Sequence, residues 1–215
     1  EAGQWFTGAG AGAEHQSTLV LTNPDRGPAV ADVTLWGPDG PLDVPELRGV
    51  RVRGGETARH DLADVVPTRG ALALHVEVSR GRLGVHVADS VDAVGRAAAA
   101  RDWLPAQIEP AESSYLLGLG ASGGTRTLTV ANPGDDEVRV GIDVVADRSE
   151  FRPAGLEEVR IRPGSVVEVD LTDVLGSDVA RGARGIKVDS TGPVTAALRT
   201  VNGDDLIASA AGQQV

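Results

Sequence analysis

The feature that most constrains the fold of this chain is an internal repeat with an offset of 109 residues. Leu47–Val65 and Leu156–Val174 align without a gap and share nine of nineteen residues. At the same offset, Thr18–Pro24 lies over Thr127–Pro133, and both segments end in Asn-Pro. Similarity at one fixed spacing over several segments indicates a duplicated structural unit. We therefore predict two copies of one domain, residues 1–109 and 110–215, joined near residues 103–112.

Each copy has the pattern of β-strands. Asn-Pro ends a strand, because proline has no backbone N–H and the Asn side chain can bond the nearby backbone. Downstream, every second residue is apolar, which is typical of a strand with one buried face. These apolar residues are Ala29, Ala31, Val33 and Leu35 in the first copy and Val138, Val140, Ile142 and Val144 in the second.

Glycines predict where the chain reverses. Gly54-Gly55 and Pro163-Gly164 predict the turns of two hairpins, and Leu72–Val87 and Ile186–Leu198 have the pattern of two more. About six or seven strands per copy predict an all-β protein built of two tandem repeated β-sandwich (Ig-like) domains.

Three segments lack a strand pattern. We expect Asp92–Arg101 and its counterpart Asp204–Ala211 to be loops or short helices, and the glycine-rich Gly8–Gly12 to be a flexible loop.

Composition excludes several function classes. The net charge is −11, with acids in excess in both copies, so neither copy has the basic surface of a nucleic-acid-binding domain. The absence of Cys excludes disulfides and thiolate chemistry. No stretch approaches the roughly 20 apolar residues of a membrane span, although the chain is compatible with an N-terminal anchor that was removed. We predict no cofactor.

Several motifs resemble a known family. They are Trp5-Phe6, Leu21–Pro24, Asp102–Pro105, Val130–Pro133 and Val169–Leu171. In this order they resemble an uncharacterised family of actinobacterial secreted or cell-envelope proteins. The resemblance covers nearly the whole chain, implies export and anchoring at the envelope, and implies no activity.

The sequence offers weak candidates for catalysis. Gly120–Gly124 imitates a nucleophile elbow but lacks the strand-then-helix context. His75 and His86 would face each other across a turn at Arg80-Gly81, with Glu77 beside them, and could bind zinc as a metal-dependent hydrolase does.

Acid pairs recur in both copies, at Asp61/Asp64 and Asp170/Asp173. Such pairs could serve a hydrolase or a calcium site, but their recurrence favours Asp side chains that bond the backbone after a strand.

Aromatic residues give the best candidates for binding. Trp36 continues the polar face of a predicted strand with Asp32 and Thr34, so we predict these three residues as a ligand or partner contact. For Trp5, Trp103 and Tyr115 we favour packing where the two copies meet.

The predicted function is a non-enzymatic interaction or scaffold module of the bacterial cell envelope, located outside the cytoplasm. The partner would be an envelope protein or a polysaccharide. The alternative is a glycan-binding β-sandwich that uses exposed aromatic side chains, and a metal-dependent hydrolase is the less favoured third hypothesis.

Overall fold

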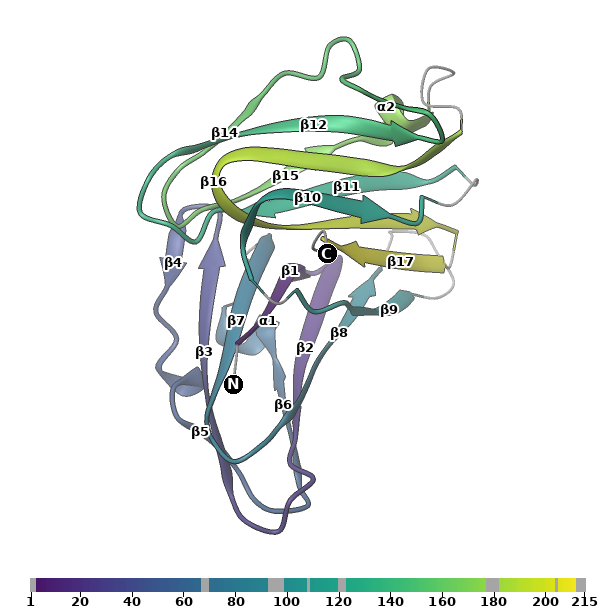
Figure 1. Ribbon diagram of the computed structural model, residues 1–215. Helices are drawn as coiled ribbons and strands as arrows, with labels where there is room; N and C mark the ends of the chain where they lie inside the picture. Colours follow the sequence, from purple (N-terminus) through teal and green to yellow (C-terminus); the bar gives the residue numbers. More distant parts are fainter. Residues whose placement is uncertain are drawn as a thin grey trace.

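The computed structural model is mostly β-structure, arranged in several antiparallel sheets (Figure 1). It describes residues 3–66, 70–92, 99–107, 109–119, 123–176, 182–203 and 205–211. The predicted all-β class is confirmed. Within these residues, no helix is both long and apolar enough to cross a lipid bilayer.

In the first half, residues 3–107, two sheets enclose one hydrophobic core that includes Phe6, Leu19, Leu35 and Leu74. One sheet has the order β1-β7-β3-β4, with β5 also pairing to β3, and the other has the order β6-β2-β8-β9. The elements are β1 (Gln4–Gly10), β2 (His15–Thr22), β3 (Ala29–Gly37), β4 (Gly40–Leu42), η1 (Pro45–Leu47), β5 (Val50–Val52), β6 (Thr57–Asp61), α1 (Leu62–Val65), β7 (Ala71–Arg80), β8 (Gly84–Val91) and β9 (Ala100–Leu104).

In the second half, residues 109–211, a sheet folds over a second core that includes Leu128, Ile142, Ile161 and Ile186. The fold is made by the long strand β16, which pairs with β10 and β12 through its first part and with β11 and β17 through its last part. The elements are β10 (Ala111–Leu117), β11 (Thr125–Ala131), β12 (Val138–Ala146), β13 (Ser149–Phe151), β14 (Val159–Ile161), β15 (Val166–Asp170), α2 (Thr172–Gly176), β16 (Ala183–Asn202) and β17 (Asp205–Ala210).

The two halves have equivalent strand pairings. β3, β4, β5 and β6 begin 109 residues before β12, β13, β14 and β15. The order β6-β2-β8-β9 recurs as β15 and β11 beside the last part of β16 and β17. This correspondence supports the predicted duplication, while the domain boundary after residue 109 stays a prediction.

The predicted hairpins are wrong, although the chain turns at Gly54-Gly55 and at Pro163-Gly164 as predicted. β5 pairs with β3 and β6 with β2, so the turn at Gly54-Gly55 carries the chain from one sheet to the other. Likewise β7 and β8 lie in different sheets, and Ile186–Leu198 belongs to one continuous strand, β16. A turn signal shows where the chain reverses but not with which strand it then pairs.

Two further expectations need correction. Gly8–Gly10 is not part of a flexible loop, since it completes the buried strand β1. Residues 205–210 form strand β17, not a loop or helix, whereas Asp204 lies outside the described residues. In the segment Asp92–Arg101, Ala100 and Arg101 begin strand β9. Residues 93–98 lie outside the described part of the chain.

The second half lies across one end of the first, with its strands running across those of the first half (Figure 1). A small apolar cluster joins them, made by Trp5, Trp36, Ala71 and Ala73 of the first half and Ala131 and Val166 of the second. The Thr7 hydroxyl donates to the Thr195 hydroxyl at 2.7 Å, and both side chains are buried. The halves are therefore joined by both packing and buried hydrogen bonds.

Candidate functional site

The junction of the two halves contains a cleft of about 740 Å³. This volume is within the range of small-ligand and peptide sites in proteins. The first half supplies Trp5, Thr34, Trp36 and His75, and the second half supplies Pro110, Glu112, Asn132, Pro133, Gly134, Asp135, Asp136, Glu137, Val138, Thr191, Gly192 and Pro193. The site is thus built from both copies of the predicted repeat.

An aromatic cluster of Trp5, Trp36 and His75 forms one wall of the cleft. Strand register explains the grouping, because Trp5 pairs with His75 and His75 pairs with Thr34 on the next strand. The Trp5 and Trp36 ring centroids are 4.9 Å apart, and the Trp5 and His75 rings stack at 4.5 Å. Such contacts hold the aromatic faces in fixed positions.

Burial against these rings lowers the pKa of His75 below its ordinary value, because the cationic form loses hydration. The carboxylate of Glu77 opposes this effect. The wall of the cleft is therefore neutral and aromatic at neutral pH.

An acidic rim faces this wall. It consists of Glu112, Asp135, Asp136 and Glu137, all exposed, and no Lys or Arg is among the described residues that line the cleft. Four carboxylates at one opening create a local negative potential that attracts cations.

The buried side chain of Asn132 positions the acidic rim. Its Nδ2 donates to the carbonyl of Asp136 at 2.7 Å and to that of Ile161 at 3.3 Å. Its Oδ1 accepts from the Gly134 N–H at 3.0 Å. The Asn-Pro motif therefore fixes the loop that carries three of the four rim carboxylates.

The chain matches a protein-family model over nearly its whole length. Residues 1–213 match the model described as a family of unknown function, DUF5719. The chain belongs to this family. No curated protein and no solved structure is significantly similar to it.

Because the DUF5719 match spans both halves, it includes every residue that lines the cleft.

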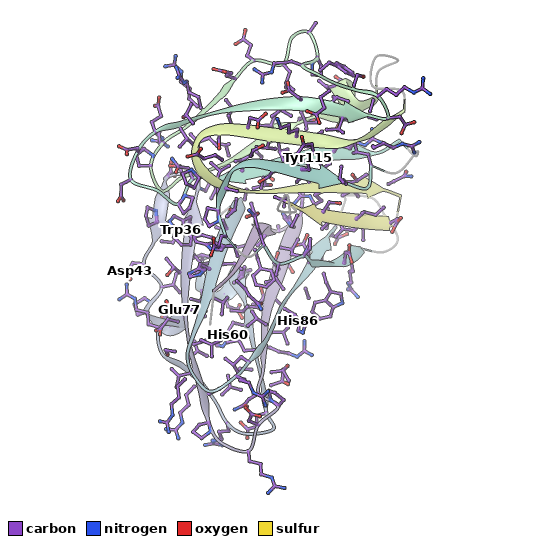
Figure 2. All side chains as sticks on the ribbon, in the orientation of Figure 1. Trp36, Asp43, His60, Glu77, His86 and Tyr115 are labelled. Atoms are coloured by element: carbon purple, nitrogen blue, oxygen red, sulfur yellow. The ribbon has the colours of Figure 1, made fainter. Side chains whose placement is uncertain are left out.

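The three predicted contact residues of this DUF5719 chain differ in how exposed they are. Asp32, Thr34 and Trp36 lie on one face of β3, and Asp32 and Thr34 are exposed, as expected. The expectation that Trp36 is exposed is wrong: it is only 9% exposed, because Trp5 and the second half cover it. Trp36 lies near the second half, and Thr34 lines the cleft with it (Figure 2).

The other aromatic residues were predicted to pack where the two copies meet, and they differ in their environments. Trp5 packs at the junction, as predicted. Trp103 does not, since it is 54% exposed on β9. Tyr115 is half-buried on β10, where its hydroxyl donates to Glu150 at 3.0 Å and the hydrogen bond raises its pKa.

The hypothesis of a zinc site at His75 and His86 is wrong in its geometry. β7 and β8 belong to different sheets, so the two side chains do not face each other. His75 stacks on Trp5, and His86 meets the edge of Trp103 at 5.7 Å. Among the described residues, no group of three His, Asp or Glu side chains is placed to hold a metal ion.

The first acid of each recurring pair bonds the backbone at the start of a helix, as favoured from the sequence. Asp61 accepts from the Ala63 N–H at 3.0 Å, and Asp170 accepts from the Thr172 N–H at 2.8 Å. Of the elbow-like segment Gly120–Gly124, residues 120–122 lie outside the described part of the chain.

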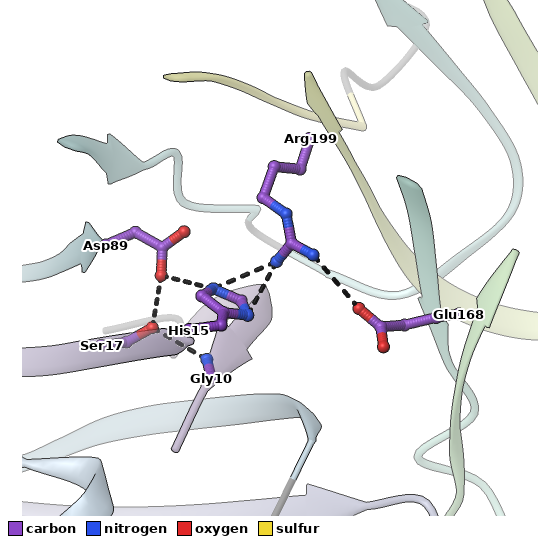
Figure 3. A network of polar contacts seen from close by, with 6 residues as sticks. All are labelled: Gly10, His15, Ser17, Asp89, Glu168 and Arg199. Atoms are coloured by element: carbon purple, nitrogen blue, oxygen red, sulfur yellow. Dashed lines mark hydrogen bonds and ion pairs between the residues drawn. The ribbon is translucent and has the colours of Figure 1, made fainter. Parts of the chain in front are cut away.

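A partly buried polar network also joins the halves (Figure 3). The Ser17 hydroxyl donates to Asp89 at 2.5 Å, and His15 Nε2 lies 2.8 Å from the same carboxylate oxygen. Arg199 of the second half lies 2.8 Å from His15 Nδ1 and 3.4 Å from Glu168. Arg199 also lies 3.1 Å from His15 Nε2, so the imidazole lies between a guanidinium and a carboxylate.

This network differs from a catalytic triad. In a triad the histidine lies between the serine and the acid, whereas here Ser17 and His15 both contact the acid. Ser17 is also buried and accepts from the Gly10 N–H at 2.9 Å. The arrangement fits a structural role at the junction.

The sequence contained a signal for the rim but not for the cleft. The run Asp135-Asp136-Glu137 was visible as a cluster of acids. Its meeting with Trp5 and His75 depends on how the halves dock, which no local pattern encodes.

Proposed function

We propose that this chain is a non-enzymatic interaction module of the bacterial cell envelope, which holds a basic segment of a partner protein in the cleft between its halves. The observation that carries the proposal is the acidic rim opposite the aromatic cluster.

The chemistry of the two walls suits Lys and Arg side chains. Carboxylates form charge-assisted hydrogen bonds with guanidinium and ammonium groups. The aliphatic stems of these side chains can lie against the parts of Trp5 and Trp36 that stay accessible, since each is 9% exposed. Trp5 and Trp36 are already packed against each other, so a ligand would meet a wall that needs little ordering.

A polysaccharide ligand at Trp36 is less well supported, because sugar stacking needs an open indole face and Trp36 is 9% exposed. A non-catalytic role is supported by the arrangement of Ser17, His15 and Asp89, which lacks the order of a triad.

Tryptophan fluorescence can test binding at the cleft. The Trp103→Phe variant leaves Trp5 and Trp36 as the remaining tryptophans of three. In this background we would titrate a nine-residue arginine peptide, with a nine-residue glutamate peptide as the charge control. We expect a saturable change with the arginine peptide only, weakened by added salt.

A matched pair of charge variants localises the site. Asp135→Asn/Asp136→Asn/Glu137→Gln should weaken binding by about tenfold or more. Glu46→Gln/Asp64→Asn/Glu56→Gln removes the same charge from exposed positions outside the cleft and should change affinity by less than about threefold. Equal weakening by the two variants would contradict a site in the cleft.

We also propose that the module acts outside the cytoplasm, as the family resemblance of its motifs implies. Fractionation of cells that carry the gene, followed by detection with an antibody, should place the protein in the envelope or the medium. Detection in the cytoplasmic fraction alone would contradict this location.

A further inference from the structure

We propose that the first half carries a second, separate binding site, for a neutral carbohydrate chain, on the outer face of the sheet β6-β2-β8-β9. Trp103 is 54% exposed on this face. Beside it lies an open groove of about 470 Å³, whose lining includes Gln16, Thr18, Asp61, Ser90, Arg101 and Trp103.

Strand register explains the shape of the groove. One row across the four strands reads Asp61, Thr18, Ala88 and Trp103, and the next row reads Gln16, Ser90 and Arg101. The small residues Ala88 and Ser90 lie in the middle of the rows, with larger side chains on either side. The hollow is therefore built into the sheet and needs no movement to form.

The side chains of the groove suit a sugar ring. An exposed indole offers a flat apolar face for the C–H groups of a pyranose, and its N–H can still form a hydrogen bond. The ring of His86 meets the Trp103 ring edge-on at 5.7 Å and an interplanar angle of 69°, which steadies the indole (Figure 2 labels His86).

The polar groups match the hydroxyls of a sugar. Gln16 and Arg101 can donate, Asp61 can accept, and Thr18 and Ser90 can do both. The lining includes three acids, Asp61, Asp89 and Asp102, and one base, Arg101. Asp89 is 2% exposed and contacts Ser17 and His15, and Asp102 accepts from the N–H groups of Trp103 and Ala208, so these two carboxylates already have partners. The excess of acids disfavours a phosphate, and the exposed indole favours a neutral sugar.

The equivalent face of the second half supports this assignment. In register, Ala197 corresponds to His86 and Ala208 to Trp103. In the second half this face lies against the first half, where Ala197 is only 5% exposed and the Ala208 N–H lies 3.3 Å from Asp102 Oδ2. At these two positions the covered copy has alanine and the open copy has the aromatic pair His86 and Trp103, whereas the hollow at Ala88 is filled by Arg199 in the covered copy.

Calorimetric titration of the full chain with cellohexaose, mannohexaose and chitohexaose can test the site, together with the NMR resonance of the Trp103 indole N–H. We expect saturable binding of at least one oligosaccharide and a shift of this resonance. Trp103→Ala should weaken binding by about tenfold or more, because stacking contacts are worth more than about 1.4 kcal/mol in such sites. Trp103→Phe should retain part of the affinity.

Leu117→Ala is the matched control, since Leu117 is 57% exposed on the second half and its removal should leave binding unchanged. No saturable binding of any of the three sugars up to about 10 mM, a range that still detects very weak affinity, would overturn the proposal. So would equal affinity for wild type and Trp103→Ala. Neither result bears on the arginine-peptide titration, which reports the cleft.

Discussion

At the scale of single residues, two buried asparagines organise equivalent turns in the two halves. Asn23 and Asn132 are each 1% exposed. Asn23 Nδ2 donates to the carbonyls of Gly27 and Val52, as Asn132 Nδ2 does to those of Asp136 and Ile161. The Asn-Pro repeat in the sequence therefore marks a side chain that replaces backbone hydrogen bonds where the strand ends.

Asn132→Ala should lower the free energy of unfolding by about 2–4 kcal/mol, because it leaves buried carbonyls without donors. Urea unfolding followed by circular dichroism would measure the change. Thr22→Ala, at an exposed strand position, should cost less than about 1 kcal/mol. Equal costs at the two positions would contradict the assigned role of Asn132.

His75 should make stability depend on pH. Its folded-state pKa lies below the ordinary value of 6.5, so the unfolded chain binds the proton more readily. The neutral form supports the fold fully above about pH 6.5, and stability should fall as the pH drops below this value towards the folded-state pKa. His75→Gln should flatten this part of the curve in urea unfolding at pH 5 to 8. A curve of unchanged slope in the variant would contradict the shift.

At the scale of elements, strand β1 has small side chains where the two halves pack closely against each other. Ala9 is fully buried in the first core, and Gly8 has a φ of 88° at an irregularity in the β1–β7 ladder. A Cβ on Gly8 would contact Thr129 and Ala197 of the second half at 3.5 and 3.8 Å. Glycine and alanine here allow β1 to lie between its own core and the second half.

Ala9→Leu should destabilise the protein by about 1–3 kcal/mol, because the added carbons have no free volume in the core. The same substitution at the exposed Ala154 should change stability by about 0.5 kcal/mol or less. Thermal unfolding of both variants would compare them. A tolerated leucine at residue 9 would mean that β1 packs more loosely than described.

These elements also show what the sequence could predict. Alternation gave β3 and β12 correctly, because period two directly reports a strand with one buried face. It could not assign partners, so the hairpins at Gly54-Gly55 and Arg80-Gly81 were mistaken for pairs within one sheet. Gly8–Gly10 was mistaken for part of a loop because small residues are shared by loops and by tightly packed strands. Trp36 was correctly predicted to share a face of β3 with Asp32 and Thr34. Its burial was not predicted, because it depends on how the two halves pack against each other.

At the scale of the whole molecule, the polar network of Figure 3 couples the halves. The side chain of Asp89 has 0% exposure, and Arg199 of the second half contacts His15, which contacts Asp89. A buried carboxylate needs compensating charge and donors nearby.

Arg199→Met should therefore lower the free energy of unfolding by about 1–3 kcal/mol, since it leaves His15 and the carboxylate without the cation. Arg48→Met removes an exposed ion pair with Asp43 and should cost less than about 1 kcal/mol. Denaturant unfolding of both variants measures the difference. If Arg199→Met were as stable as wild type, the network would not contribute to joining the halves.

The most direct test of binding in the cleft is a residue-by-residue NMR map of the full chain during titration with the nine-residue arginine peptide. We predict that the largest shifts occur at the amides of residues 132–138 and at the indole N–H groups of Trp5 and Trp36. Shifts spread evenly over acidic surface positions, or concentrated away from the junction of the halves, would contradict a binding site in the cleft.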